Sequence, residues 1–292
     1  MNSVIVGSQV VSSSAPTYMI AEIGINHNGD LDIAKKLINE AFKAGFNAVK
    51  FQKRTVSVVF SPEELARPRE SVFGETNGDL KFGLEFSRAD FSEIDTYCKS
   101  LGIDWFASPW DVESLHFLEE FDVVAHKVAS ACLTDKSLLK ALKATGKPVF
   151  ISTGMSTLEQ IREALDLLDP EKTVLMHTVS VYPAALEQLH LSWIDELKTN
   201  FPKIPVGYSG HEAGVMPSVI AVAKFGAVCV ERHITLDRSM WGSDQSASLE
   251  PEGLNKVVKY IRSIPIVSGT GIKHILKEEE PILEKLRRVK DF

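Results

Sequence analysis

Eight short apolar segments recur along the 292-residue chain, and each is followed by a polar stretch and then by apolar residues at helical spacing. This alternation predicts parallel strands joined by crossover helices. The segments are read by content, because strands covered on both faces lose the alternating pattern of half-buried strands. The predicted strands are residues 18–23, 48–52, 105–108, 125–129, 149–153, 174–178, 205–208 and 228–233.

The stretches between these strands carry helix signals, and residues 32–44 are the clearest case. Their apolar side chains repeat at helical spacing behind Asp30, a residue type that caps helix N-termini, and Gly45 follows as the expected stop. The same pattern predicts helices at residues 157–168, 191–200, 215–225 and 251–261.

Eight strand–helix units in about 270 residues favour a closed (β/α)8 TIM barrel, an α/β fold, over an open doubly wound sheet. Residues 1–16 are predicted to form an N-terminal β-hairpin around Gly7-Ser8 that covers the bottom of the barrel. Residues 17–272 then form the barrel, and residues 273–292 a helical tail or linker. Residues 54–84 are too long for an ordinary connection, so we expect a functional loop over the active face.

Charge and cysteine content limit the partners and the compartment. With 32 basic and 39 acidic residues the net charge is −7, which argues against a protein that binds nucleic-acid backbones. No segment reaches the length of apolar residues that a membrane span needs, so we expect no membrane partner. Cys98, Cys132 and Cys229 lack metal-binding spacing and the N-terminus lacks a leader pattern, so we expect a reduced, cytoplasmic protein.

Two lysines, Lys50 and Lys127, lie inside otherwise apolar predicted strands, where an unpaired ammonium group is costly. One alternative is a structural ion pair with Glu22 or Glu231. The other is a bound phosphate or carboxylate, held also by serine hydroxyls at the ends of other strands. Those serines are Ser108, Ser130, Ser152 and Ser209, and their number favours the second alternative.

Two histidines, His211 and His233, lie at the ends of neighbouring predicted strands and can therefore converge on one point. Together with water, and with Glu22 and Asp244 nearby, they predict a site for a divalent metal such as Mn²⁺ or Mg²⁺. The alternative is a pair of satisfied core histidines. Glu22 should point into the barrel mouth as a general base or a residue that positions water, unless it only pairs with Lys50.

Several motifs resemble, in their order along the chain, those of the N-acetylneuraminate (sialic acid) synthase family, which includes legionaminate and pseudaminate synthases. The resemblance runs from the first hairpin to about Arg288 and therefore covers the whole barrel. The motifs are residues 21–30 (AEIGINHNGD), 49–53 (VKFQK), 151–155 (ISTGM), 207–212 (GYSGHE), 230–237 (VERHITLD) and 242–251 (GSDQSASLEP).

The resemblance implies condensation of phosphoenolpyruvate with an N-acylmannosamine-type aldehyde sugar to a nonulosonate, with release of phosphate. It implies a catalytic set of Glu22, Lys50, Lys127 and His233, with His211 and His233 as ligands of a metal that activates the aldehyde. Lys50 and Lys127 would hold phosphoenolpyruvate together with the four serines. The other residues implied to bind substrate are Gln52, Ser180, Tyr182 and Asp244.

The chain departs from the family pattern at two places. Cys132 stands where the family usually has a Glu or Asp that faces the sugar. Its position two residues after Ser130 would place it at the site, but a buried, inert thiol is the interpretation that we favour. Family members also carry a C-terminal antifreeze-like domain that joins them as homodimers, and the sequence ends at the expected start of its linker. These departures keep two other functions open: a synthase for a non-acylated sugar, and a catalytically silent sugar-phosphate sensor.

Overall fold

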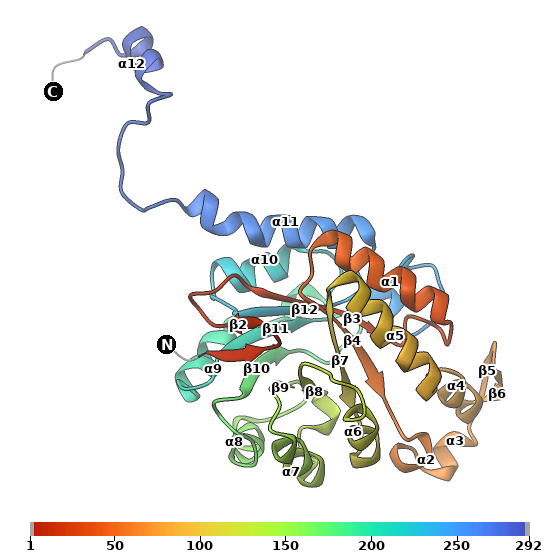
Figure 1. Ribbon diagram of the computed structural model, residues 1–292. Helices are drawn as coiled ribbons and strands as arrows, with labels where there is room; N and C mark the ends of the chain where they lie inside the picture. The colour runs from red at the N-terminus through yellow and green to blue at the C-terminus, as the bar shows by residue number, and fades with distance from the viewer. Residues whose placement is uncertain (1–2, 290–292) are drawn as a thin grey trace.

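The computed structural model describes residues 3–289 and confirms the predicted TIM barrel (Figure 1). Eight parallel strands close in the order β10-β11-β12-β3-β4-β7-β8-β9. No strand end differs by more than two residues from its prediction. The strands are β3 (Tyr18–Gly24), β4 (Ala48–Lys53), β7 (Asp104–Pro109), β8 (His126–Val128), β9 (Val149–Ser152), β10 (Thr173–Thr178), β11 (Val206–Gly210) and β12 (Cys229–His233).

The helices surround the strands, and α1 (Leu31–Ala44) shows why they form where they do. The Asp30 carboxylate accepts hydrogen bonds from the first turn, and Gly45 ends the helix with a φ of 87°, which glycine adopts without strain. The other helices that follow the barrel strands are α5 (Arg88–Leu101), α6 (Val112–Leu118), α7 (Lys136–Thr145), α8 (Leu158–Asp166), α9 (Trp193–Asn200), α10 (Met216–Ala223) and α11 (Pro251–Ser268).

The N-terminal hairpin, β1 (Val4–Val6) and β2 (Gln9–Val11), closes the bottom of the barrel as predicted. Its valines Val4, Val6 and Val11 are buried. The Gln9 side chain accepts a hydrogen bond from Asn47, the residue directly before β4, at 2.7 Å. The hairpin therefore covers the N-terminal ends of the strands and leaves the opposite end open.

Residues 54–84, predicted to form a functional loop over the active face, contain secondary structure of their own. They fold into α2 (Val56–Val59), α3 (Pro62–Leu65), a hairpin of β5 (Pro68–Ser71) and β6 (Gly74–Thr76), and α4 (Asn77–Gly83). Local caps explain the helices, since Ser61 caps α3 and Thr76 forms a capping box with Asp79 at the start of α4. The segment does lie at the C-terminal end of β4, on the active face.

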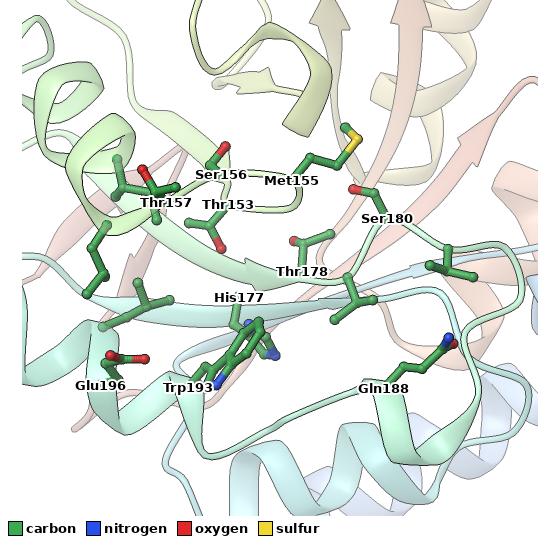
Figure 2. A pocket seen from close by; sticks show the side chains of 15 residues that line it. Thr153, Met155, Ser156, Thr157, His177, Thr178, Ser180, Gln188, Trp193 and Glu196 are labelled. Atoms are coloured by element: carbon green, nitrogen blue, oxygen red, sulfur yellow. The ribbon is translucent and has the colours of Figure 1, made fainter.

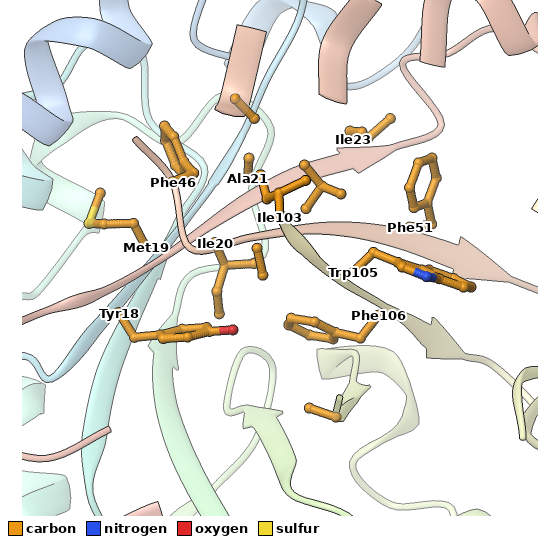
Figure 3. Packing of buried hydrophobic residues seen from close by; sticks show 14 of the residues in the cluster. Tyr18, Met19, Ile20, Ala21, Ile23, Phe46, Phe51, Ile103, Trp105 and Phe106 are labelled. Atoms are coloured by element: carbon orange, nitrogen blue, oxygen red, sulfur yellow. The ribbon is translucent and has the colours of Figure 1, made fainter. Parts of the chain in front are cut away.

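The barrel interior is filled by large side chains from several strands, some of which Figure 3 shows. The rings of Tyr18 and Phe106 each stack on the ring of Phe150, at centroid distances of 6.0 and 5.5 Å. This layer of side chains fills the interior of the barrel, so a ligand of the barrel binds at its open end.

Beyond the barrel, the chain runs away from the strands and includes the short helix α12 (Glu280–Leu286) (Figure 1). The helix α11 continues seven residues past the predicted end at residue 261, and Ile266 and Val267 on its last turns are exposed. Within residues 3–289, no helix has the length and apolar character needed to cross a bilayer.

Candidate active site

The polar residues predicted at the strand ends meet in one pocket of about 240 Å³ at the open end of the barrel. The strand register explains this, because it pairs Glu22 with Lys50 on one side and with His233 on the other. Asp244 lies at the edge, with its carboxylate 3.6 Å from His233 Nδ1. Every other predicted site residue lines the pocket: Glu22, Lys50, Gln52, Ser108, Lys127, Ser130, Ser152, Ser180, Tyr182, Ser209, His211 and His233.

Lys50 lies within ion-pair distance of both Glu22 and Glu231, the two alternative partners considered from the sequence. Its Nζ lies 2.7 Å from Glu22 Oε2 and 3.8 Å from Glu231 Oε1, and it also donates to the Ser108 hydroxyl at 3.0 Å. Gln52 donates to the other oxygen of Glu22 at 2.8 Å. The Glu22 carboxylate is therefore fixed between an ammonium group and an amide.

Lys127 has a similar arrangement of partners. Its Nζ lies 3.7 Å from Glu231 Oε1 and donates to Ser152 Oγ at 2.6 Å. Ser209 donates to the same Glu231 oxygen at 3.1 Å. Glu231 therefore joins both lysines and a serine in one network.

The buried charges in this network shift the acidities of its members. Burial lowers the pKa of Lys127, while the carboxylate of Glu231 acts in the opposite direction. Burial alone would raise the pKa of Glu231, but the charges of Lys127 and Lys50, with smaller effects of His233 and His211, lower it to about 2. Glu231 is therefore ionised at neutral pH.

Several buried polar atoms of pocket-lining residues have no hydrogen-bond partner within residues 3–289. Besides Glu22 Oε2, which forms an ion pair with Lys50, they are Trp110 Nε1, Ser180 Oγ, Glu231 Oε2 and His233 Nδ1. Buried polar groups in folded proteins are nearly always paired, so unpaired atoms gathered at one pocket point to a ligand or ion that completes them. This is the strongest structural sign that the pocket binds something polar.

The two histidines converge as predicted, with their ring centroids 5.2 Å apart. His211 Nδ1 donates to the Val179 carbonyl at 2.7 Å, which leaves the lone pair of Nε2 free. Burial and the neighbouring His233 lower the pKa of His211 to about 3, so its ring is neutral, the form that binds metals. Tyr182 stacks on His211 at 3.9 Å and packs edge-on against His233.

These residues fit a divalent ion whose protein ligands are two imidazoles, with water and substrate at the other positions. The orphan nitrogen of His233 and the neutral ring of His211 support that fit. In the part of the chain that the structure describes, no group of three or more His, Cys, Asp or Glu side chains is arranged to hold a metal. A closed structural metal site is therefore not present there, and an open one remains the hypothesis.

Behind the histidines lies a fully buried ion pair between their neighbours in sequence, Arg232 and Glu212. Arg232 Nη1 lies 2.8 Å from Glu212 Oε1, and both side chains have an exposed fraction of 0%. Arg232 also donates to the Gly214 carbonyl, and Tyr208 donates to Glu212 at 2.7 Å. This network ties the end of β12 to the segment after β11 and so fixes the backbone that carries both histidines.

Some pocket residues were not predicted as site residues from the sequence. Glu231 was considered only as a structural partner for the lysines, although it lies at the centre of the network. Trp110 lines the pocket two residues after Ser108, and Met155 lines it directly after the ISTG run, with a positive φ of 59°. Their positions just past strand ends are the signal that would have found them.

Cys132 does not line the pocket, and its side chain is buried, which agrees with the interpretation favoured from the sequence. It ends the short 3-10 helix Ser130–Cys132, which turns its side chain into the apolar cluster with Leu133 and Leu138. Its sulfur lies 4.0 Å from the Trp110 carbonyl oxygen. Burial raises the pKa of Cys132 to about 12, so the thiol is neutral and unreactive.

We therefore expect Cys132→Glu to lower the free energy of unfolding by at least about 2 kcal/mol, because it buries a polar group without a partner. Urea denaturation followed by circular dichroism measures this. Cys132→Ala is the control for lost volume alone and should lose less. A Cys132→Glu variant as stable as the alanine variant would show that position 132 can turn toward the pocket.

A second pocket, of about 550 Å³, opens beside the first and shares Met155, Thr178 and Ser180 with it (Figure 2). Most of its wall comes from the segments after β9 and β10 and from α8 and α9, with Trp193 as its largest side chain. Glu196 is its one carboxylate, and its wall contains no lysine or arginine. This pocket therefore suits an uncharged group.

Comparisons with known proteins all match the chain to the same family of synthases. A family model described as "NeuB family" matches residues 37–273. The N-acetylneuraminate-9-phosphate synthase of Homo sapiens is 39% identical over 280 residues, which cover 94% of this chain and 78% of that protein. The N,N'-diacetyllegionaminic acid synthase of Campylobacter jejuni is 35% identical, over 93% and 83% of the two chains.

A solved structure supports the same assignment. The N-acetylneuraminic acid (sialic acid) synthetase from Leptospira borgpetersenii, crystallised with citrate, superposes with a TM-score of 0.83 at 31% sequence identity. The match covers 99% of this chain and 98% of that one. The likeness therefore spans the barrel and its N-terminal hairpin.

Proposed function

Because this chain belongs to the NeuB family of sialic acid synthases and related synthases, we propose that it condenses phosphoenolpyruvate with an N-acylmannosamine-type aldehyde sugar. The product would be a nonulosonate, a sialic-acid-like sugar. The observation that carries the proposal is the pairing, in one pocket, of two buried lysines and several hydroxyls with two converging imidazoles. This condensation needs cationic groups that bind the anionic phosphoenolpyruvate, next to groups that can polarise the aldehyde.

The reaction that we propose balances as follows. Carbon 3 of phosphoenolpyruvate attacks the aldehyde carbon and forms the new carbon–carbon bond. Water adds its oxygen to carbon 2, the bond from carbon 2 to the bridging oxygen breaks, and inorganic phosphate leaves. The aldehyde oxygen takes up a proton and becomes a hydroxyl, while a keto group remains at carbon 2.

The phosphate and carboxylate of phosphoenolpyruvate would bind between Lys50 and Lys127. Ser108 and Ser152 already lie within hydrogen-bond distance of these ammonium groups, so their hydroxyls are placed to contact the same anion. Ser130 accepts from the Gly154 N–H at 3.2 Å, which leaves its own proton free to donate. Ser209 can turn from Glu231 toward the same substrate.

Glu22 would hold the attacking water or move its proton, because Lys50 and Gln52 fix its carboxylate at the pocket floor. Gln52, Ser180, Tyr182 and Asp244 would contact the sugar, and the unpaired Ser180 hydroxyl supports that role. A divalent ion such as Mn²⁺ or Mg²⁺, held by His211 and His233, would supply Lewis-acid polarisation of the aldehyde oxygen.

The direct test measures phosphate released from phosphoenolpyruvate in the presence of Mn²⁺ when aldoses are offered one at a time. Release with N-acetylmannosamine or its derivatives supports the proposal. Release only with non-acylated sugars would change the acceptor, and no release with any sugar would favour a sensor.

Lys127→Met tests the proposed binding of phosphoenolpyruvate by the two lysines. We expect phosphoenolpyruvate to bind about 10- to 150-fold more weakly, which corresponds to the roughly 1.5–3 kcal/mol of a charge-assisted hydrogen bond. Calorimetric titration with phosphoenolpyruvate measures this, and thermal unfolding checks that the variant folds. Lys140→Met is the control, because Lys140 is exposed on α7. If Lys127→Met loses stability but keeps its affinity, the lysine is only a structural partner of Glu231.

A further inference from the structure

Arg54, the residue directly after β4, lies next to the active site without lining its pocket. Its side chain is largely buried, with an exposed fraction of 11%, and so is that of its ion-pair partner Glu85. A guanidinium group that is removed from water needs well-placed partners. The proposed function gives Arg54 no part in the reaction.

The guanidinium group of Arg54 is held from two directions. Its Nη1 lies 3.3 Å from Glu85 Oε1, and its central carbon lies 4.5 Å from the centroid of the Trp110 ring, a cation–π contact. The backbone N–H of Arg54 also donates to Glu85 Oε2 at 3.1 Å. Because Glu85 follows α4, this pair joins the two ends of the segment 54–84 beside β4 (Figure 1).

Held in this way, Arg54 reaches the pocket through one side chain, that of Gln52. Arg54 Nη2 donates to Gln52 Oε1, and Gln52 Nε2 donates to Glu22 Oε1 at 2.8 Å. The other oxygen of Glu22 lies 2.7 Å from Lys50 Nζ. A continuous chain of hydrogen bonds therefore runs from the buried arginine to the carboxylate on the pocket floor.

The charges at the two ends of this chain determine how the Gln52 amide is turned. A guanidinium group has only donors and an ionised carboxylate has only acceptors, whereas an amide has one of each. Only one orientation satisfies both ends, with the oxygen toward Arg54 and the NH2 group toward Glu22. Within residues 3–289, Arg54 is the one side chain that donates to Gln52 Oε1, so without it nothing there holds the amide in that orientation.

We propose that Arg54 is a positioning residue for the reaction, which orients the Gln52 amide and through it the Glu22 carboxylate. The inference rests on the proposed function, in which Gln52 contacts the sugar and Glu22 acts on water. Arg54 itself touches no reacting atom. Its loss should therefore impair use of the sugar and turnover more than the binding of phosphoenolpyruvate.

The neighbouring residue Lys53 provides a matched control. Its Nζ lies 3.0 Å from Glu85 Oε2, and the exposed fraction of its side chain is 14%, close to that of Arg54. It lies over the ring of Phe117 and has no hydrogen bond to Gln52. Lys53→Met therefore removes a similarly buried charge from the same carboxylate without affecting the amide.

The test is a double-mutant cycle between Arg54→Met and Gln52→Met, with phosphate release as the assay. Arg54→Met should lower kcat about tenfold and raise KM for the sugar, while KM for phosphoenolpyruvate changes less than about twofold. In the Gln52→Met background, the same substitution should change kcat by less than about twofold, because the amide is already gone. Lys53→Met should keep the wild-type kcat.

Thermal unfolding checks that the variants fold. Lys53 remains beside Glu85 in Arg54→Met, so the carboxylate keeps one cation. Arg54→Gln, which keeps a polar side chain there, takes its place if Arg54→Met does not fold. Unchanged kcat, an equal loss in Lys53→Met or an undiminished effect in the Gln52→Met background would each overturn the inference.

A second measurement needs no turnover. Nuclear magnetic resonance can follow hydrogen exchange of the Gln52 side-chain NH2 group, whose signals are assigned by their loss in Gln52→Met. We expect exchange about tenfold faster in Arg54→Met than in Lys53→Met, because the amide no longer holds its bond to Glu22. If the wild type releases no phosphate with any sugar, the proposed function fails, and this comparison still decides the inference. Equal exchange rates in the two variants would contradict it.

Discussion

Replacing Arg232 with methionine is expected to lower the free energy of unfolding by about 3–5 kcal/mol. Arg232 and Glu212 form an ion pair from which water is fully excluded, with 0% of either side chain exposed. The substitution leaves the Glu212 carboxylate buried without its cation and removes the hydrogen bonds from Arg232 to the Gly214 carbonyl and Ser218. Urea denaturation of the wild type and the variant measures the difference.

A surface ion pair of the same type gives the control. Arg238 pairs with Glu250 at 3.3 Å, but 47% and 37% of the two side chains remain exposed. Arg238→Met should therefore cost no more than about 1 kcal/mol. The double variant Arg232→Met with Glu212→Leu should recover part of the lost stability, because it removes the buried charge as well. An Arg232→Met variant no less stable than Arg238→Met would contradict the assignment.

His211→Ala and His233→Ala are each expected to weaken Mn²⁺ binding by at least about a hundredfold and to abolish phosphate release from phosphoenolpyruvate. The two imidazoles are the proposed nitrogen ligands, and each comes from a different strand end, so neither should replace the other. Calorimetric titration with Mn²⁺ alone measures the binding without any dependence on turnover.

His116→Ala is the control for the histidine variants, because His116 is exposed on α6. It should bind Mn²⁺ as the wild type does. Unchanged Mn²⁺ affinity in either His211→Ala or His233→Ala would remove that residue from the proposed metal site, whatever the effect on activity.

The barrel itself could be predicted because its strands are buried on both faces and its helices carry local signals. Asp30 and Gly45 mark the two ends of α1 in the sequence, and the structure confirms both. The site residues could be predicted because the C-terminal ends of parallel strands meet at one end of a barrel. Lys50, Lys127 and the two histidines needed only the strand positions to be placed together.

Features that depend on side-chain direction or on several distant loops could not be predicted. The position of Cys132, two residues after Ser130, does not by itself decide between the pocket and the core, and the turn after Ser130 places its side chain in the apolar cluster. The β5–β6 hairpin was missed because its short strands are exposed or half-buried and lack a run of apolar residues. The pocket lined by Ile25, Asn28, residues 69–84 and residues 241–243 combines three segments separated by more than forty residues in the sequence, so no local pattern reveals it.

The matched charges around Lys50 and Lys127, the proposed binding site for phosphoenolpyruvate, have a consequence for how an anion reaches the pocket. The negative charges of Glu22 and Glu231 offset the positive charges of Lys50 and Lys127, so these four residues carry no net positive charge. The whole chain is also anionic, with a net charge of −7. Long-range attraction therefore does not steer the substrate inward, and added salt should not slow its association. The substrate must instead arrive by diffusion. Its anionic groups then replace the carboxylates of Glu22 and Glu231 as partners of the two lysines, one contact at a time.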